Sequence, residues 1–233
     1  VRVLEIMGGE PFYMKEFRKL IDKLVDMGVS KNIMITLSTN GTHYNDNLIN
    51  KIVGNFENLG FNISLDGVEE KFDYLRHGDN WDNVKSNLDK FYKLHTENDH
   101  VNINVTHTVS VWNFFYLRDF HHYFETNYPE FLIWNNLVHF PEWCEANVVP
   151  GLTKHVIADR VKHPEDFGLP KWNEEKYNKD IAPLVEHALT DSTEEHWQKF
   201  IEQVSAGDVY RNESFEDTFT ELYNVVKGDM ISI

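Results

Sequence analysis

The chain has 233 residues and a formal net charge of −16, which argues against a nucleic-acid partner because affinity for phosphate backbones rests largely on lysine and arginine. Apolar residues make up 41% of the sequence and support a buried core, but no apolar run approaches the roughly 20 residues that cross a bilayer, so we expect no membrane partner. The single cysteine, Cys144, excludes a disulfide framework, and with no signal peptide in view we expect a cytoplasmic protein.

The sequence opens with a predicted strand, residues 1–7, that stops at two glycines. A helix is predicted at residues 14–27, where apolar side chains recur three and four positions apart. Between the two elements, Gly8 and Gly9 permit positive φ angles and the close approach of a ligand to the backbone. Glu10 stands at the carboxyl end of the strand, where ligands bind in parallel α/β folds, and we expect it to be free to accept hydrogen bonds from a ligand cation.

The same succession of strand and helix recurs along the chain. Asn40-Gly41 marks a tight turn after the second strand. Alternation of this kind, with helices long enough for crossovers, predicts a parallel α/β sheet or barrel. Further strands are expected at residues 33–37, 61–65, 101–111 and 131–139, and further helices at residues 46–59, 69–77, 81–95 and 114–124.

Polar side chains alternate along two of the predicted strands. Because successive side chains of a strand point to opposite faces, each set shares one face. A packed barrel prefers bulky apolar residues inside, so these faces indicate a lumen that holds a polar ligand. The alternative is that they face outward and form hydrogen bonds with helices. The two sets are Asn62, Ser64 and Asp66 in the third strand, and Asn102, Asn104, Thr106 and Thr108 in the fourth.

The pattern changes after residue 139. Prolines interrupt the chain, and only helical patches follow until a short apolar tail at residues 230–233. Ser192 or Thr193 is a predicted N-cap, with acidic residues in the turn that follows. We therefore expect a barrel core at residues 1–140 and a helical C-terminal extension at residues 141–233. The expected helices cover residues 152–161, 174–189, 193–204 and 215–226.

Three strand ends carry small polar groups, and in a parallel sheet all three lie on one rim. Such a rim suits a zwitterion that carries a sugar. Glu10 fits the ammonium group, and serine and threonine hydroxyls fit a carboxylate. Asp66 suits ribose hydroxyls or a cation, and Arg76, beyond the third strand, can pair with the carboxylate.

These motifs resemble the radical S-adenosylmethionine (radical SAM) family, specifically members that carry a twitch or SPASM-type module. The resemblance covers about residues 1–140, and a weaker similarity reaches residues 210–222. Each motif is short, and the combination is more specific than any one of them because the motifs follow successive strands. They are Gly8-Gly9-Glu10-Pro11, Thr39-Asn40-Gly41-Thr42, Ile63-Ser64-Leu65-Asp66-Gly67 and Tyr74-Leu75-Arg76.

The resemblance implies a partial (β/α)6 TIM-like barrel, here without its first strand. It also implies that Gly8, Gly9 and Glu10 hold the methionyl ammonium group of S-adenosylmethionine, and that Thr39 and Ser64 contact its carboxylate or ribose. Residues 108–109 and 137–138 then border the adenine. The implied cofactor-binding set is Gly8, Gly9, Glu10, Thr39, Asn40, Ser64, Asp66 and Arg76.

The sequence departs from the family pattern in one respect. The family holds a [4Fe-4S] cluster through Cys-x-x-x-Cys-x-x-Cys after its first strand, and that strand and loop are absent here. We therefore expect a fragment whose cluster ligands lie upstream of Val1, with no metal ligand in this chain. The implied parent enzyme generates a 5′-deoxyadenosyl radical and abstracts hydrogen from a small-molecule or peptide substrate, using an electron donor. This chain alone is expected to be inactive.

Two other functions are compatible with the sequence. One is a cluster-free protein that binds S-adenosylmethionine or another nucleoside on a degenerate barrel. The other is a metallohydrolase with histidine and carboxylate ligands, because His107 and His139 lie near predicted strand ends, although no His-x-His spacing is present. Cys144 follows the fifth predicted strand and is either a small packing residue or a hydrogen-atom donor.

Overall fold

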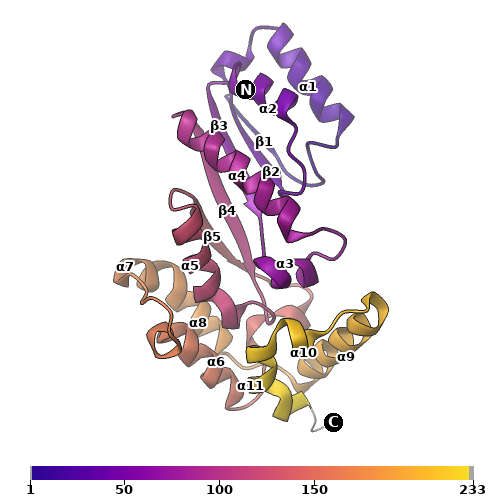
Figure 1. Cartoon of the computed structure of the whole chain (residues 1–233), viewed down its shortest axis with the longest axis vertical. Coiled ribbons are helices and arrows are strands. Elements are labelled where there is room, and N and C mark those ends of the chain that lie inside the picture. Colours follow the sequence, from indigo (N-terminus) through magenta and orange to yellow (C-terminus); the bar gives the residue numbers. More distant parts are fainter. Residues whose placement is uncertain (1, 231–233) are drawn as a thin grey trace. The chain divides into compact units, whose positions relative to one another are not determined.

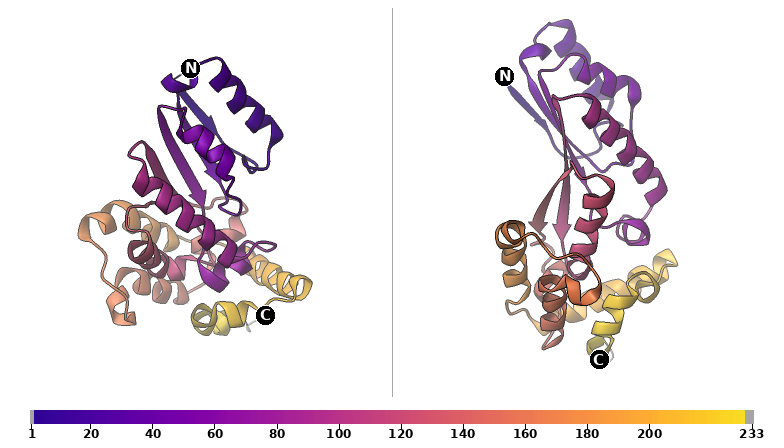
Figure 2. Two further views of the ribbon diagram at one scale, coloured as in Figure 1. Left: turned by 45° about the horizontal axis from the view of Figure 1, so that its top comes forward. Right: turned by 60° about the vertical axis from the view of Figure 1, so that its left-hand side comes forward.

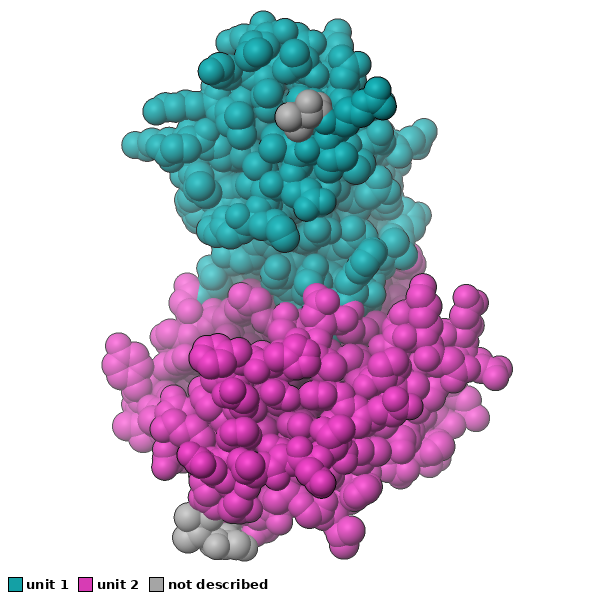
Figure 3. Space-filling model, turned by 180° about the vertical axis from the view of Figure 1, so that it is seen from behind, with its two compact units in different colours: residues 1–65, 79–107, 130–134 teal, residues 66–78, 108–129, 135–233 magenta. Residues whose placement is uncertain are grey.

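The computed structural model describes residues 2–230 (Figure 1). The chain divides into two compact units, each assembled from separate stretches (Figure 3). The first unit contains residues 1–65, 79–107 and 130–134, and the second contains residues 66–78, 108–129 and 135–233. This division follows contacts rather than sequence, and the expected boundary at residue 140 stays a prediction.

Five strands form one sheet in the order β1-β2-β3-β4-β5. The pairs β1–β2, β2–β3 and β3–β4 are parallel, which confirms the predicted parallel α/β class. The order places β1 at one end of the sheet. Residue 1 of the first predicted strand lies outside the described residues. The strands are β1 (Val3–Ile6), β2 (Met34–Thr39), β3 (Asn58–Ser64), β4 (Val101–Val109) and β5 (Leu132–Leu137).

Three long helices belong to the first unit: α1 (Lys15–Asp26), α2 (Asp46–Val53) and α4 (Trp81–Glu97). The predicted helix at residues 46–59 is too long, because α2 ends at the C-cap Gly54 and β3 has begun by Asn58. Leu59 follows the helical spacing of the preceding apolar residues, yet it also alternates with the apolar residues of the strand. Pairing of Leu59 with Ile35 in the sheet therefore decides its structure.

One face of the sheet in the first unit is apolar and buried. Ile35, Phe61 and Ile63 are fully buried on it. The Phe61 ring lies 5.3 Å from the ring of Phe91 on α4 and 6.5 Å from that of Phe12. Figure 2 shows the helices of this unit on one side of its strands. Burial of these large side chains is the main source of stability for such a layer.

The opposite face of the same strands is polar and half-exposed. Ser38 of β2 is in register with Asn62 of β3, which is in register with Asn104 of β4. The Asn104 side-chain amide donates a hydrogen bond to the Asn62 side-chain oxygen at 3.0 Å. Ser64 follows on the same face, in register with Thr106. The predicted sharing of a face is confirmed for these residues, and the two asparagines bond to each other rather than to a helix.

The second unit is mainly helical, as predicted for the C-terminal extension. Thr193 is the N-cap of α9, which continues to Arg211 rather than stopping at residue 204. Met230, the first residue of the apolar tail, ends α11, and residues 231–233 lie outside the described part of the chain. The helices are α3 (Glu69–Leu75), α5 (Leu117–Asn127), α6 (Thr153–Lys162), α7 (Glu174–Lys176), α8 (Ala182–Ala188), α9 (Glu194–Arg211), α10 (Phe215–Thr218) and α11 (Thr220–Met230), with a π-helical turn at Tyr177–Ile181.

Among the described residues, no helix combines the length and the apolar character that a membrane span requires.

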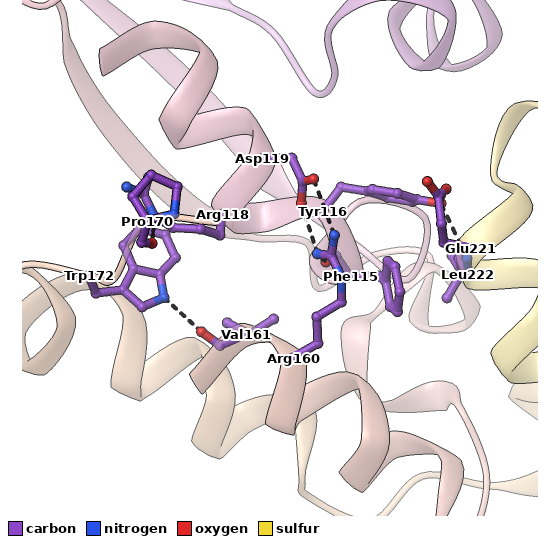
Figure 4. A network of polar contacts seen from close by, with 10 residues as sticks. All are labelled: Phe115, Tyr116, Arg118, Asp119, Arg160, Val161, Pro170, Trp172, Glu221 and Leu222. Carbon is purple, nitrogen blue, oxygen red and sulfur yellow. Dashed lines mark hydrogen bonds and ion pairs between the residues drawn. The ribbon is translucent and has the colours of Figure 1, made fainter. Parts of the chain in front are cut away.

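A buried arginine joins α5 and α6 in the second unit (Figure 4). The Arg160 guanidinium donates two hydrogen bonds to the Asp119 carboxylate, at 2.8 and 3.1 Å, and another to the Phe115 carbonyl. Beside it, the Tyr116 hydroxyl donates to Glu221 at 2.9 Å, and burial raises the pKa of Tyr116 above its ordinary value. The two-bond contact between Arg160 and Asp119, here called the Arg160 fork, fixes the spacing of α5 and α6.

Replacing Arg160 by methionine should lower the free energy of unfolding by about 2–4 kcal/mol. The change removes a buried charge and leaves the Phe115 carbonyl and the Asp119 carboxylate without their donor. Urea unfolding followed by circular dichroism measures the loss. Lys199→Met, at a half-exposed lysine of the same unit, should stay within about 0.5 kcal/mol of the wild type. Equal effects of the two variants would contradict a stabilising role for the Arg160 fork.

Candidate functional site

The backbone turns sharply where β1 ends. Gly8 and Gly9 have φ angles of 82° and 63°, in the left-handed region that side chains with a Cβ rarely adopt. A Cβ built on Gly8 would have no atom within 4 Å, and one on Gly9 would lie 3.4 Å from the sulfur of Met14. The glycines are therefore required by backbone conformation, and they leave space beside the strand end.

The Glu10 carboxylate is held by the neighbouring strand end. The Thr39 hydroxyl lies 2.9 Å from both carboxylate oxygens and donates to them, and the Asn40 N–H donates to Oε2 at 3.0 Å. Pairing of Ile6 with Leu37 places the ends of β1 and β2 side by side, so Glu10 already accepts hydrogen bonds from the chain. Its contact with a ligand cation stays a prediction. The carboxylate is oriented before any ligand arrives.

The turn after β2 is built from its own side chains. The Thr39 hydroxyl also accepts a hydrogen bond from the Gly41 N–H at 3.2 Å. The side-chain oxygen of Asn40 accepts from the N–H and the hydroxyl of Thr42, at 3.0 and 2.8 Å. Gly41 has a φ of 76°. This chemistry confirms the predicted turn and fixes the Thr39 hydroxyl that holds Glu10.

Two asparagines of α4 form hydrogen bonds with this turn, and the sequence analysis did not identify them as part of the site. The side-chain amide of Asn87 donates to the Gly41 carbonyl at 3.0 Å, and that of Asn83 donates to the Thr42 carbonyl at 2.8 Å. Asn87 is 5% exposed on the buried face of the helix, next to Leu88. A polar residue on an apolar helix face needs a buried partner, and that signal could have identified it.

The first unit therefore brings together most of the predicted site. Gly8, Gly9 and Glu10 follow β1, Thr39 ends β2 and Asn40 follows it. The Glu10 carboxylate joins the two strand ends through its hydrogen bonds with Thr39 and Asn40. Ser64 ends β3, the next strand in the sheet, on its polar face. His107, considered above as a metal ligand, is fully buried in β4, and that burial disfavours an accessible metal position.

Asp66 and Arg76 belong to the second unit. The Arg76 guanidinium pairs with the Asp66 carboxylate at 2.5 Å, and the second carboxylate oxygen accepts the Thr108 N–H at 3.1 Å. The side chain of Asn113 donates to the carbonyls of both Asp66 and Thr108, at 2.9 Å each. Arg76 Nε is buried and has no hydrogen-bond acceptor among the described residues. Contact of Arg76 with a ligand carboxylate stays a prediction.

The two segments expected to border an adenine are adjacent in the second unit. The Val138 N–H donates to the Val109 carbonyl at 3.1 Å. Near them, the Cys144 carbonyl accepts from the Val111 N–H at 2.9 Å. Burial raises the pKa of the Cys144 thiol to about 11, so the group stays protonated at neutral pH. A protonated thiol is a weak nucleophile.

Comparison with known proteins gives two findings. The family model described as the radical SAM superfamily matches residues 1–120. A solved structure of native anSMEcpe with bound AdoMet (S-adenosylmethionine) is similar to this chain with a TM-score of 0.50 and 19% identity, over 76% of this chain and 48% of that one. A structure of hexahistidine-tagged anSMEcpe with bound AdoMet gives 0.48 and 19%, over 71% and 43%.

These likenesses have defined limits. The chain spans less than half the length of those two solved chains. At this identity the first of them shows a shared fold alone, which agrees with a partial TIM-like barrel. Closure of the barrel is not shown, and the twitch or SPASM-type subtype stays a prediction. No curated protein matches the chain.

Replacing Gly8 by alanine should lower the free energy of unfolding by about 1–2 kcal/mol, because the added Cβ meets no neighbour and only the left-handed backbone opposes it. Thermal and urea unfolding measure the change. Gly207→Ala is the matched control, since Gly207 lies inside α9 with open space around it, and alanine should stabilise a helix there by about 0.5–1 kcal/mol. A neutral Gly8→Ala variant would show that the left-handed turn is not needed.

Proposed function

The chain belongs to the radical SAM superfamily, and we propose that it forms the part of a radical SAM enzyme that binds S-adenosylmethionine. The match of the family model to residues 1–120 supports the family. The single observation that carries the proposal is the hydrogen-bonded rim of Glu10, Thr39 and Asn40 behind two left-handed glycines. This rim combines glycine backbone that no side chain covers with an oriented carboxylate and a hydroxyl. It lies at the carboxyl ends of parallel strands, where ligands bind in this class of fold.

We propose that Glu10 receives the ammonium group of the methionyl moiety. An ionised carboxylate accepts about four hydrogen bonds. The Glu10 carboxylate accepts one hydrogen bond from the Thr39 hydroxyl and one from the Asn40 N–H. The Phe12 N–H is more distant, at 3.4 Å. At least one acceptor position is therefore left for a cation, and a charge-assisted bond there is stronger than a neutral one. Gly8 and Gly9 allow the ligand to approach the backbone.

The remaining site residues are assigned the roles toward S-adenosylmethionine that the family resemblance implies. We propose that Ser64 and Thr39 contact its carboxylate or ribose, and that Asp66 lies near the ribose. Arg76 retains a buried Nε donor that an anionic group can use, although its terminal nitrogen is paired with Asp66. These assignments follow the order of the motifs along the chain.

The iron–sulfur cluster needs ligands that this chain does not supply. A [4Fe-4S] cluster is held by several thiolates, and the sequence contains one cysteine, Cys144. We therefore propose that the cluster cysteines belong to a part of the protein outside these 233 residues. With one electron from a reduced cluster, bound S-adenosylmethionine would be cleaved at its sulfonium to methionine and a 5′-deoxyadenosyl radical, which would abstract hydrogen from the substrate. We propose a cytoplasmic enzyme that acts on a small molecule or peptide and uses an electron donor.

A cluster-free binding protein is the second candidate, and the lone cysteine favours it. The coding sequence upstream of Val1 separates the two. Three cysteines at the family spacing there would support the enzyme. If those cysteines are absent, the purified chain is titrated with S-adenosylmethionine in a calorimeter. Binding without iron would support the cluster-free binding protein, and no binding would refute it.

The proposed enzymatic activity is tested with the complete gene product, after its cluster has been reconstituted anaerobically with iron and sulfide. We expect 5′-deoxyadenosine to form from S-adenosylmethionine under reducing conditions, as measured by liquid chromatography. Absence of this product in a protein that contains the cluster would refute the proposal.

Within that protein, Glu10→Gln should raise the KM for S-adenosylmethionine at least about tenfold, because loss of one charge-assisted hydrogen bond costs about 1.5–3 kcal/mol. Initial rates over a range of cofactor concentrations measure it. Glu5→Gln is the matched control, because Glu5 is exposed on β1, the strand that precedes Glu10, and the KM of this variant should be unchanged. An unchanged KM in Glu10→Gln would remove Glu10 from the site.

A further inference from the structure

We propose that His139, Glu145 and His187, all in the second unit, form a binding site for one divalent transition-metal ion, with Zn²⁺ the ion that fits best. Each residue offers one ligand atom, and these atoms all lie within 4.8 Å of one another. Imidazole nitrogen and carboxylate oxygen are common zinc ligands, and a set of two histidines and one glutamate is typical of zinc sites that keep a position open.

The three ligands come from separate segments of the chain. His139 follows β5, Glu145 lies between two short 3₁₀ turns, and His187 lies in the last turn of α8. The side-chain amide of Asn147 donates to the Thr190 hydroxyl at 2.9 Å, which ties the Glu145 segment to the end of α8.

A lysine reinforces the same connection. Lys154 Nζ donates to the backbone carbonyls of both Asn147 and Thr190, at 3.1 and 2.7 Å. Two of the ligands are therefore carried on segments that hydrogen bonds hold together, as metal sites require. His139 is the exposed member of the set, so it is the ligand that can adjust when an ion binds.

The distances fit a tetrahedral ion after small movements. His187 Nε2 lies 3.1 Å from a carboxylate oxygen of Glu145, and zinc bonds of about 2.0–2.1 Å place neighbouring ligand atoms roughly 3.3 Å apart. The imidazole rings of His139 and His187 are perpendicular, with centres 5.7 Å apart. Two imidazoles bound to one tetrahedral ion have ring centres roughly 5 Å apart.

An ordinary ion pair explains the cluster less well. His187 Nε2 is buried and makes no hydrogen bond of acceptable geometry among the described residues, although a Glu145 oxygen lies 3.1 Å away. A protonated histidine paired with a carboxylate would direct its N–H at that oxygen. A lone pair on Nε2 that points to an ion satisfies the same atom, and a buried polar atom left unsatisfied is costly.

The site leaves at least one coordination position for solvent. Three protein ligands complete three of the four positions that Zn²⁺ prefers, and the exposure of His139 gives water access to the fourth. His139 was considered in the sequence as a ligand of a metallohydrolase, whereas Glu145 and His187 were not recognised as its partners.

The test uses the full 233-residue chain, stripped with a chelator and dialysed. Calorimetric titration with ZnCl₂ should show one ion bound per chain, and His139→Ala and His187→Ala should each weaken that binding at least about 100-fold, since a ligand matters no less than the outer partners that support it. Melting curves of the metal-free variants check that they fold. If His187→Ala does not fold, the exposed His139 decides alone.

Two controls define the ligand set. His155→Ala removes an exposed histidine of the same unit and should bind Zn²⁺ like the wild type. Cys144→Ser removes the neighbouring thiol and should also leave binding unchanged. Failure of the wild-type chain to bind one equivalent of Zn²⁺ would overturn the proposal. So would unchanged binding in both ligand variants, or loss of binding in either control.

Discussion

The two-residue alternation of side chains along parallel strands is the constraint on which the first unit depends. The register places Ser38, Asn62 and Asn104 in one row, and the apolar residues that alternate with them, including Leu37, Phe61 and Ile63, are buried on the other face. A shift of any strand by one residue would bury the polar row and expose the aromatic core. The same register brings the ends of β1 and β2 together, and the bond between Glu10 and Thr39 follows from it.

Much of this arrangement could be read from the sequence, because it rests on local periodicity. Strand–helix alternation, the polar rows, the turn at Asn40-Gly41 and the cap at Thr193 all have local signals. The end of α2 could not be placed, since Leu59 satisfies both the helical and the strand period and only pairing with Ile35 separates them. The family resemblance added ligand-binding roles for Glu10, Thr39 and Ser64, which local periodicity does not supply.

The interactions that were missed are those between segments distant in the sequence. Asn83 and Asn87 support a turn that lies far from them along the chain, and no short motif joins them to it. The ligands His139, Glu145 and His187 likewise converge only after α8 has packed, so their spacing matches no metal-binding pattern. Contacts of this kind form only in the tertiary structure. In a single sequence their one signal is a polar residue, such as Asn87, on an otherwise apolar helix face.

The place of β1 at the end of the sheet has a consequence for handling the protein. The strand pairs with β2 on one side, and its other side carries backbone donors and acceptors at the spacing of a further strand. Val3 is 48% and Met7 72% exposed beside them. Exposed strand edges of this kind promote association between molecules. If this edge stays uncovered, it would favour pairing with a strand of another molecule, and a charged residue in place of Val3 would oppose that pairing.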